Sequence, residues 1–382
     1  MYSQQIREDF LYMMLYGAAA MLSLAACCYL LLRRSNAIAP DVTSPLHLRR
    51  WTAAFFASLT LSHVWYLPTF YLTSAEDILL SNAIGAILDF LTAIPFAIIV
   101  LLSMLQDRRR PLWPVFLMMA PLIIGLSVCG ISHNNTILPL LYAYYLLIGI
   151  ALLAYMVRAT RQYGRWLRDN YADLEHKEVW QSFVIMAVIL LVFVIYALEP
   201  QATFYKYITQ LNGIILVCYL LWRVETLSDL CITDRPTAEE PGQVDHPLDQ
   251  DSHLDPDGMD DNNLAQANYN KIASLLQRHC IDTQLYLQHD LTLLQLAKTI
   301  GTNRTYLSSY FVEEGITYNA YINDLRIHHF VRLYHEAVAA RRSFTAQQLA
   351  YESGYRSYST FSLAFKQRMG QTVSAWMRDA AV

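Results

Sequence analysis

The sequence predicts an all-α protein built from a seven-helix transmembrane bundle and a cytoplasmic all-helical domain. Three observations predict this fold class. The chain of 382 residues is 55% hydrophobic and 16% charged, whereas a soluble protein of this length carries about a quarter charged residues. Nearly all of the apolar excess lies before residue 223. Beyond that point apolar residues recur at helical spacing, without the alternation that is typical of strands.

Seven long apolar runs predict the membrane helices. A helix needs about 20 apolar residues to cross a hydrocarbon core of ~30 Å, and each run meets or approaches that length. Proline and glycine inside such runs are tolerated in membrane helices. Residues 1–223 therefore form the predicted membrane domain, with spans at Phe10–Leu32, Trp51–Ser74, Ile78–Gln106, Pro111–Ile131, Ile137–Val157, Val179–Leu198 and Phe204–Trp222.

The distribution of lysine and arginine predicts the orientation. The connections after the first, third and fifth runs carry clusters of arginine, and Arg223 follows the seventh run. The connections at 75–77 and 132–136 carry neither arginine nor lysine. Because cytoplasmic loops hold the excess of positive residues, we expect the N-terminus outside and the C-terminal part in the cytoplasm. The predicted location is a bacterial inner membrane, with the lipid bilayer as a partner.

The first run has a second interpretation, because Leu24–Cys27 ("LAAC") resembles a lipoprotein cleavage box. A signal peptide requires a basic flank and a short apolar core. The flank here is Arg7-Glu8-Asp9, and the apolar run continues to Leu32. A membrane span is therefore the favoured interpretation.

The residues that carry enzyme chemistry do not form a recognisable pattern. The six cysteines have neither the spacing of a disulfide framework nor the paired motifs of a zinc site. We find no nucleophile–base set and no glycine-rich phosphate loop in the sequence. The sequence therefore predicts a protein that is not an enzyme and that uses no metal or other cofactor.

An acidic stretch separates the two parts of the chain. Residues 234–263 hold ten acidic residues against one arginine, with several prolines and glycines. Such a composition cannot bury enough apolar surface to offset the entropy of ordering. We therefore expect residues 224–263 to form a disordered linker that reaches roughly 30 Å. The negative charge of the linker either keeps it away from anionic lipid and DNA by repulsion or has no role, in which case the linker is only a spacer.

Residues 264–382 contain a helix-turn-helix pattern twice. The copies read "LQLAKTIGTNRTYLSSYFVEEG" and "QQLAYESGYRSYSTFSLAFKQRMG". Each has Leu-Ala on a short helix and a glycine four residues later, Gly301 or Gly354, which lets the chain turn sharply. Asn303 and Ser357 are suited to cap the second helices. The buried faces of those helices are expected to hold Leu307, Phe311, Phe361 and Phe365.

This region resembles the AraC/XylS-type DNA-binding domain. The resemblance rests on "LYLQHDLTLLQLAKTIGTNRTYLSSYF", "YINDLRI" and "SGYRSYSTFSLAFKQRMGQT", and its details are similar to a subgroup common in Bacteroidetes-type bacteria. It implies two helix-turn-helix units joined by a helix at roughly 323–338, whose recognition helices enter successive major-groove turns about 34 Å apart. It also implies double-stranded promoter DNA as a partner, with RNA polymerase and a second copy of the chain as further candidates.

The resemblance implies which side chains contact DNA. Bidentate arginine or amide contacts give the sharpest base readout. The second unit departs from the family pattern at Phe330, Leu363 and Val373, so its recognition helix either grips the backbone or reads a thymine methyl through Leu363. A helix-turn-helix that serves protein contacts alone is the alternative. The expected DNA contacts are Arg304, Thr305, Ser308, Ser309, Ser357, Tyr358, Ser359, Ser362 and Lys366; Arg341, Arg342, Arg356 and Arg368 are either phosphate contacts or solvated surface charges.

Four polar residues inside the predicted spans are candidates for sensing. At a rise of ~1.5 Å per residue, His63 and Asp89 lie near mid-depth, and Gln210 and Asn212 lie in the outer half of the last span. Polar groups at this depth are costly and default to functional hypotheses. They either bind a small-molecule or membrane signal or form interhelical hydrogen bonds that fix the packing.

These observations predict a membrane-embedded one-component transcription regulator that senses a signal through its spans and binds promoter DNA. Two alternatives remain open at this point. The spans could serve only to tether a transcription factor, or a transporter-like sensor could carry a regulatory DNA-binding module.

Overall fold

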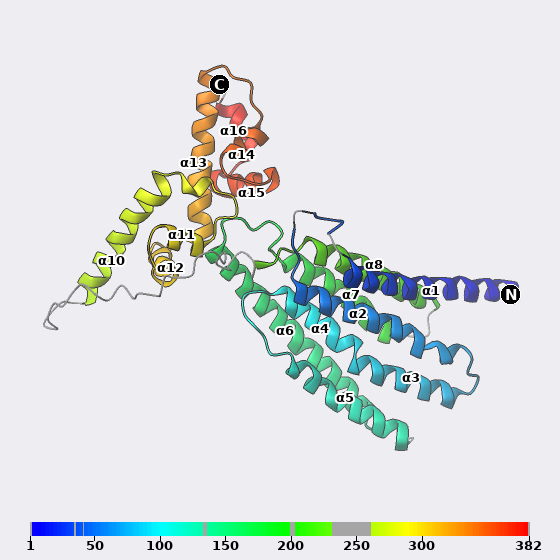
Figure 1. The fold of residues 1–382 in the computed structure, drawn as a ribbon. Helices are drawn as coiled ribbons and strands as arrows, with labels where there is room; N and C mark the ends of the chain where they lie inside the picture. Colours follow the sequence, from blue (N-terminus) through cyan, green and yellow to red (C-terminus); the bar gives the residue numbers. More distant parts are fainter. Residues whose placement is uncertain are drawn as a thin grey trace. The chain divides into compact units, whose positions relative to one another are not determined.

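The computed structural model describes residues 2–33, 36–40, 42–132, 136–198, 203–230 and 261–380. The regular elements of the described residues are all helices, without any strand, so the all-α prediction is confirmed for them (Figure 1). The chain divides into two compact units. Unit 1 comprises Met1–Gly164 and His176–Thr233, and unit 2 comprises Arg165–Glu175 and Asp234–Val382. A short piece of the N-terminal half of the sequence therefore belongs to the C-terminal unit.

Unit 1 is a bundle of helices. α1 packs against α2 and α8, α2 also packs against α4, and α3 packs against α5. A 3-10 turn, Leu67–Phe70, follows α2. The helices are α1 (Tyr2–Leu32), α2 (Leu46–Trp65), α3 (Ala75–Leu91), α4 (Ala93–Met104), α5 (Trp113–Ser132), α6 (Leu138–Asn170), α7 (Trp180–Leu198) and α8 (Thr203–Thr226), of which α6 ends within unit 2.

Five segments of the described chain are long and apolar enough to cross a membrane, fewer than the seven that we predicted. They are Phe10–Leu32, Glu76–Met104, Trp113–Ser132, Leu138–Asn170 and Lys206–Thr226. The predicted sixth span is represented by a shorter apolar helix, Trp180–Ile189, within the described residues. The predicted second span is not among the five. Its helix α2 begins early enough to include His47, Arg49 and Arg50, which make it more polar.

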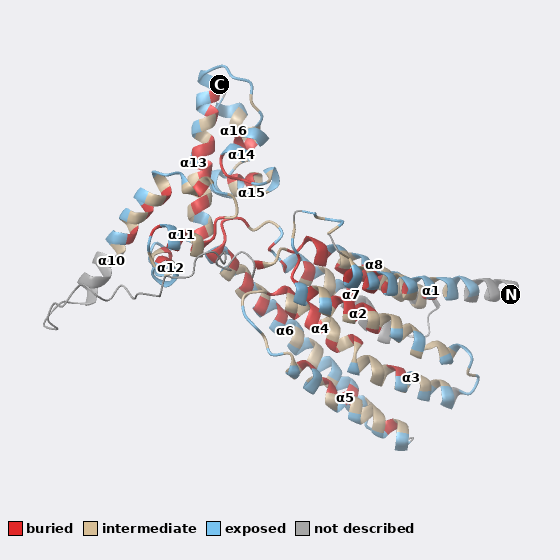
Figure 2. Ribbon diagram, viewed as in Figure 1, coloured by how far each residue is buried: buried red, intermediate tan, exposed pale blue. Residues whose placement is uncertain are grey.

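The surface of unit 1 is apolar over long stretches. On α6, Leu146, Leu147 and Ile150 are each at least 60% exposed, and Figure 2 shows exposed residues along the outer faces of α3, α5 and α6. Soluble proteins rarely expose continuous apolar patches of this extent. Helices that face lipid have no need to bury these side chains, so the surface is compatible with a membrane.

Prolines set the helix boundaries that differ from the predicted runs. Proline lacks an amide hydrogen, and its ring clashes with the carbonyl four residues earlier. Pro95 would clash with Leu91, and the single run that we predicted at 78–106 is in fact two helices separated at Thr92. In the same way, α2 ends at Trp65, before Pro68, although the predicted run extended to residue 74.

Unit 2 is organised around a long central helix, α13 (Tyr318–Ala339). In Figure 1 the helices α10 (Asp261–Leu276), α11 (Leu293–Thr299) and α12 (Arg304–Glu313) lie on one side of it. The helices α14 (Ala346–Glu352), α15 (Tyr358–Met369) and α16 (Val373–Ala380) lie on the other. Each group closes its own hydrophobic core against one part of α13. The connecting helix that we expected at roughly 323–338 is therefore present and longer.

The predicted linker is only partly described. α8 continues to Thr226, beyond the boundary expected at Arg223, and Leu227 and Leu230 are buried. α10 begins at Asp261, within the last three residues assigned to the linker. Residues 231–260, which carry most of the acidic charge, lie outside the described residues.

Candidate nucleic-acid interface

The two glycine turns have the same backbone geometry. Gly301 and Gly354 have φ of +74° and +88°, values that favour glycine. In the first unit the amide of Thr302 donates to the carbonyl of Ala297 at 2.9 Å, and in the second the amide of Tyr355 donates to Ala350 at 3.2 Å. Both are the six-residue hydrogen bond that ends a helix on a left-handed residue. The predicted turns are therefore confirmed at both positions.

The recognition helices α12 and α15 start at the predicted capping residues. The side chain of Asn303 accepts a hydrogen bond from the amide of Thr305 at 2.7 Å, and the hydroxyl of Ser357 accepts one from Thr360 at 3.3 Å. These bonds satisfy amide groups that the first turn of a helix leaves unpaired. The predicted inner faces are also confirmed, since the buried residues of α12 and α15 are Leu307, Phe311, Phe361 and Phe365.

The expected DNA-contacting residues lie on the opposite side of each helix. On α12, Arg304, Thr305 and Ser309 are exposed and Ser308 is half-buried. On and before α15, Tyr358, Ser359 and Lys366 are exposed, while Ser357 and Ser362 are half-buried. The exposed face of α15 also carries Leu363, which is 61% exposed. An outward-facing polar surface is what DNA binding requires, and the individual contacts stay predictions.

Two of the departures from the family pattern fill the second core. Phe330 is fully buried, with its ring centroid 4.5 Å from that of Phe361 and 5.7 Å from that of Phe365. Val373 is 1% exposed in the same core, at the start of α16. The large side chain at position 330 is thus accommodated by packing, and it leaves the outer face of α15 unchanged.

Arg341, Arg342, Arg356 and Arg368 were expected to be either phosphate contacts or surface charges. Two of them form close ion pairs with carboxylates. Nη1 of Arg356 lies 2.8 Å from Oδ2 of Asp290, and Arg368 pairs with Asp324 of α13. Arg342 lies at 3.9 Å from Glu352, and Arg341 occupies a left-handed position with φ of +52°. Exposed ion pairs of this kind contribute little to stability.

Sequence reasoning missed Arg326, the residue that joins the two helix-turn-helix units within unit 2. Its side chain is 1% exposed, its Nε and Nη2 donate to the carbonyls of Tyr286 and Gln288 at 2.7 Å each, and its guanidinium lies 5.5 Å from the ring centroid of Tyr355. Burial lowers the pKa of Arg326, and the guanidinium stays protonated in proteins. Arg326 could have been predicted to be buried from its position in "YINDLRI", between Ile322 and Ile327, which are both buried.

The buried thiol of Cys280 belongs to the first core. Burial raises its pKa to about 11, so the thiol is protonated and unreactive at neutral pH. Within the described residues, no group of three His, Cys, Asp or Glu side chains could hold a metal ion.

Three of the four candidate sensing residues, His63, Asp89 and Gln210, lie in two neighbouring contacts of unit 1. Nε2 of His63 on α2 lies 3.2 Å from the amide oxygen of Gln210 on α8, and Nδ1 lies 2.7 Å from the carbonyl of Leu59. Because a carbonyl only accepts hydrogen bonds, Nδ1 of His63 carries a proton. If Nε2 carries none, it accepts a hydrogen bond, and its partner is then the amide nitrogen of Gln210. The nitrogen and oxygen of a side-chain amide can be exchanged by a flip of the group. Asp89 accepts instead from Ser62 at 3.3 Å.

Two adjacent contacts therefore join α2 to α8 and to α3. The backbone carbonyl of His63 also accepts from the hydroxyl of Tyr16 on α1, at 2.6 Å. Asn212 lies apart from this group and donates to the carbonyl of Ile189 on α7 at 3.1 Å. A hydrogen bond from a side chain to a buried backbone carbonyl fixes packing, which is the structural role that we kept open for Asn212.

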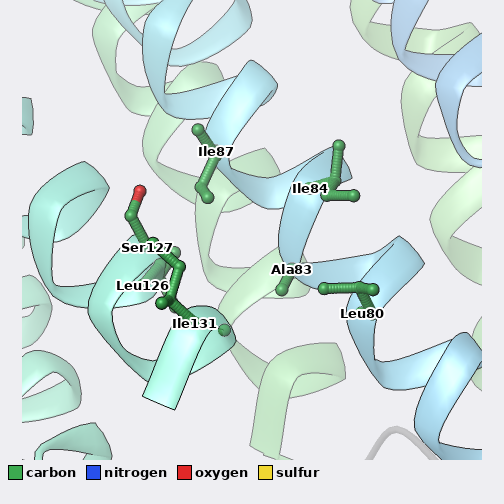
Figure 3. A pocket seen from close by; sticks show the side chains of 8 residues that line it. Leu80, Ala83, Ile84, Ile87, Leu126, Ser127 and Ile131 are labelled. Carbon is green, nitrogen blue, oxygen red and sulfur yellow. The ribbon is translucent and has the colours of Figure 1, made fainter. Parts of the chain in front are cut away.

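A pocket of about 260 Å³ lies between α3 and α5 (Figure 3). The hydroxyl of Ser127, the one polar side chain that lines it, donates to the carbonyl of Ile123 within its own helix. None of the four candidate sensing residues lines this pocket, whose walls are Leu80, Ala83, Ile84, Ile87, Leu126, Ser127, Gly130 and Ile131.

Comparison with known proteins supports the interface. Residues 296–379 match a family model described as a helix-turn-helix domain, and this range holds both turns, both recognition helices and α13. Comparisons with curated proteins and with solved structures found no significant match. The match supports an AraC-type helix-turn-helix in this region and a DNA-binding regulator as the function of the C-terminal unit.

Proposed function

We propose that this protein is a membrane-embedded one-component transcription regulator, whose bundle receives a signal and whose C-terminal unit binds promoter DNA. The observation that carries the proposal is the presence, in one chain, of membrane-length apolar helices and of two capped helix-turn-helix units. The tandem arrangement suits adjacent turns of the major groove. A chain of this kind needs no separate phosphotransfer step between signal and promoter.

The proposed topology has seven spans, an outside N-terminus and a cytoplasmic C-terminal unit in a bacterial inner membrane. The charge distribution supports this orientation, since arginine clusters follow the first, third and fifth runs. Promoter DNA is accessible only from the cytoplasm, so the DNA-binding unit must lie on that side. The linker expected at residues 224–263, apart from the ends that belong to α8 and α10, gives it room to reach the duplex.

For sensing, the contact between His63 and Gln210 favours the bundle as receiver over a passive tether. An imidazole near mid-depth and an amide in the outer half of the last span are polar groups that a tether does not need. The chemistry fits a small polar or protonating signal that enters among α1, α2 and α8. A bundle that only anchors the DNA-binding unit remains the second candidate, and a transporter-like sensor is the third.

Genome-wide occupancy in cells that express the full chain tests the proposal. We expect discrete promoter sites that disappear in the double variant Ser308→Ala, Ser309→Ala, because these hydroxyls lie on the outer face of α12. The matched control is Ser374→Ala on the exposed face of α16, which should keep every site. Equal amounts of all three proteins in the membrane fraction exclude a folding effect. Occupancy that the double variant leaves unchanged would contradict the assignment of α12.

A further inference from the structure

We propose that residues 165–175, the last turns of α6 and the chain that follows them, are an internal ligand of the N-terminal turns of α12 and α15 in unit 2 and exclude DNA while docked. The inference rests on the proposed function and adds its mode of control. These eleven residues precede the helix-turn-helix region by more than 100 positions, yet they form one compact unit with it. Neither the family match nor the sequence pattern includes them.

The backbone of the segment is built into the first helix-turn-helix unit. Tyr171 forms an antiparallel bridge with Thr292, the capping residue of α11, and the amide of Ala172 donates to the carbonyl of Leu291 at 3.2 Å. The side-chain amide of Asn319 donates to the carbonyls of Tyr171 and Ala172, at 3.2 and 2.7 Å. Both polar groups of the Ala172 peptide backbone are thus paired with unit 2.

The docked segment is also buried. Ala172 is 1% exposed and belongs to the core that α10, α11, α12 and α13 enclose, beside Leu291 and Leu293. The amide of Glu175 donates to Oδ1 of Asp173 at 3.0 Å, which turns the chain locally. A segment that supplies a core residue and satisfies its own backbone is a specific ligand of the domain.

Two side chains of the segment, Asn170 and Glu175, hold the two recognition helices. Arg304, the first residue of α12, donates to Oδ1 of Asn170 at 2.5 Å, and the amide of Asn170 is oriented by its own bond to the carbonyl of Trp166. Thr360, in the first turn of α15, donates its hydroxyl to the carboxylate of Glu175 at 3.0 Å. One short segment therefore contacts the N-terminal turns of both α12 and α15.

These turns are where DNA must bind. Recognition helices present their N-terminal residues to base edges, and the positive end of a helix dipole attracts phosphate. The carboxylate of Glu175 brings negative charge to the first turn of α15, where it would repel a phosphate. While the segment is docked, Asn170 occupies Nη2 of Arg304 and withholds this donor from a base or phosphate. Release of the segment from unit 2 is therefore required for both helices to engage one duplex.

A disulfide that locks the segment in place tests this inference. Residues opposite each other in an antiparallel pair have Cα atoms about 4.5–5.5 Å apart, within the range that a disulfide spans. The variant Tyr171→Cys, Thr292→Cys is made in the full chain and reconstituted in lipid nanodiscs. The single variants control for the lost cap at Thr292 and for any pairing with native cysteines.

The probe is a duplex that the reduced full chain selects from a random pool. We expect oxidation of the double variant to weaken binding of this duplex about tenfold or more, because a disulfide in about nine-tenths of the molecules leaves only a tenth able to bind. Reduction should restore binding. The selected duplex should also slow disulfide formation. The single variants should bind equally in both redox states. In a second variant, Ala172→Gln, the larger polar side chain should expel the segment and strengthen binding severalfold.

Failure to form the disulfide in membranes would overturn docking, and a disulfide that leaves DNA affinity unchanged would overturn exclusion. If the reduced protein selects no duplex at all, the proposed function fails, while the yield of disulfide still reports whether the segment docks.

Discussion

The guanidinium of Arg326 on α13 lies 5.5 Å from the ring centroid of Tyr355, which follows the turn of the second helix-turn-helix unit. The same side chain donates to two carbonyls in the loop before the first unit, at Tyr286 and Gln288. A single buried cation therefore fixes the position of one helix-turn-helix relative to the other. The spacing of the recognition helices depends on this residue.

We expect Arg326→Met to destabilise unit 2 by roughly 2–4 kcal/mol, because it leaves the carbonyls of Tyr286, which is buried, and Gln288 without this donor. Arg332→Met, on the same helix but 53% exposed, should change stability by less than about 0.5 kcal/mol. The measurement is the urea concentration at which the buried thiol of Cys280 becomes reactive in protein whose other cysteines are replaced. Equal midpoints for the two variants would contradict the role of Arg326.

The two turn glycines should differ in their tolerance of alanine. At Gly354 a Cβ would lie 2.8 Å from the backbone Cα and carbonyl oxygen of Leu287, whereas at Gly301 it would meet nothing within 4 Å. Both positions have positive φ, which costs a non-glycine residue about 1–2 kcal/mol. We expect Gly301→Ala to cost about that much and Gly354→Ala to cost roughly 3 kcal/mol or more. Thermal unfolding followed by proteolysis of unit 2 measures both, and equal losses would mean that the contact with Leu287 relaxes freely.

Unit 2 should lose stability in mild acid through His329. Burial, reinforced by Arg332, lowers the pKa of His329 below its ordinary value of 6.5, although Glu336 and Glu352 oppose the shift. Its Nδ1 lies 3.1 Å from the hydroxyl of Tyr286 and 2.7 Å from Nη2 of Arg332, so it accepts hydrogen bonds that a proton would break.

The unfolded chain then binds more protons than the folded one below pH about 6.5. Stability contributed by neutral His329 is complete above this pH and falls as the pH drops toward the lower folded pKa. The thermal midpoint of unit 2 at pH 7.5 and 5.5 measures the effect. His329→Gln should flatten the dependence, and His328→Gln, whose side chain is 66% exposed, should keep it. An unchanged slope in His329→Gln would assign the pH dependence to other groups.

Local signals explain why the helix-turn-helix units were predictable. Gly301 and Gly354 need positive φ, Asn303 and Ser357 cap the helices that follow them, and each effect acts within a few residues. The break between α3 and α4 at Thr92 could have been predicted from Pro95. It was missed because the run around it is apolar without interruption, which favours one long helix. The docking of residues 165–175 was not predictable. It depends on the backbone of Tyr171 and Ala172 meeting Asn319 almost 150 positions away, and backbone hydrogen bonds leave no side-chain pattern.

If the bundle senses, its polar contacts should affect signalling more than folding. Gln210→Leu removes the partner of His63 at 3.2 Å, and Asp89→Asn replaces the carboxyl group beside Ser62 by an amide. We expect each to change reporter output at an occupied promoter severalfold, with an unchanged amount of protein in the membrane. Asn212→Leu should instead lower the amount of folded protein, because it frees the carbonyl of Ile189. If neither Gln210→Leu nor Asp89→Asn alters the reporter output, the result would favour a bundle that only anchors the DNA-binding unit.

The central claim is that unit 2 reads a DNA sequence. The most direct test is the ratio of affinities of the full chain in nanodiscs for a selected duplex and for a scrambled duplex of the same composition, at physiological salt. Docking of residues 165–175 weakens both affinities equally and leaves the ratio unchanged. The account predicts a ratio of about 10³ or more, as specific DNA-binding proteins show. A ratio near one would contradict it.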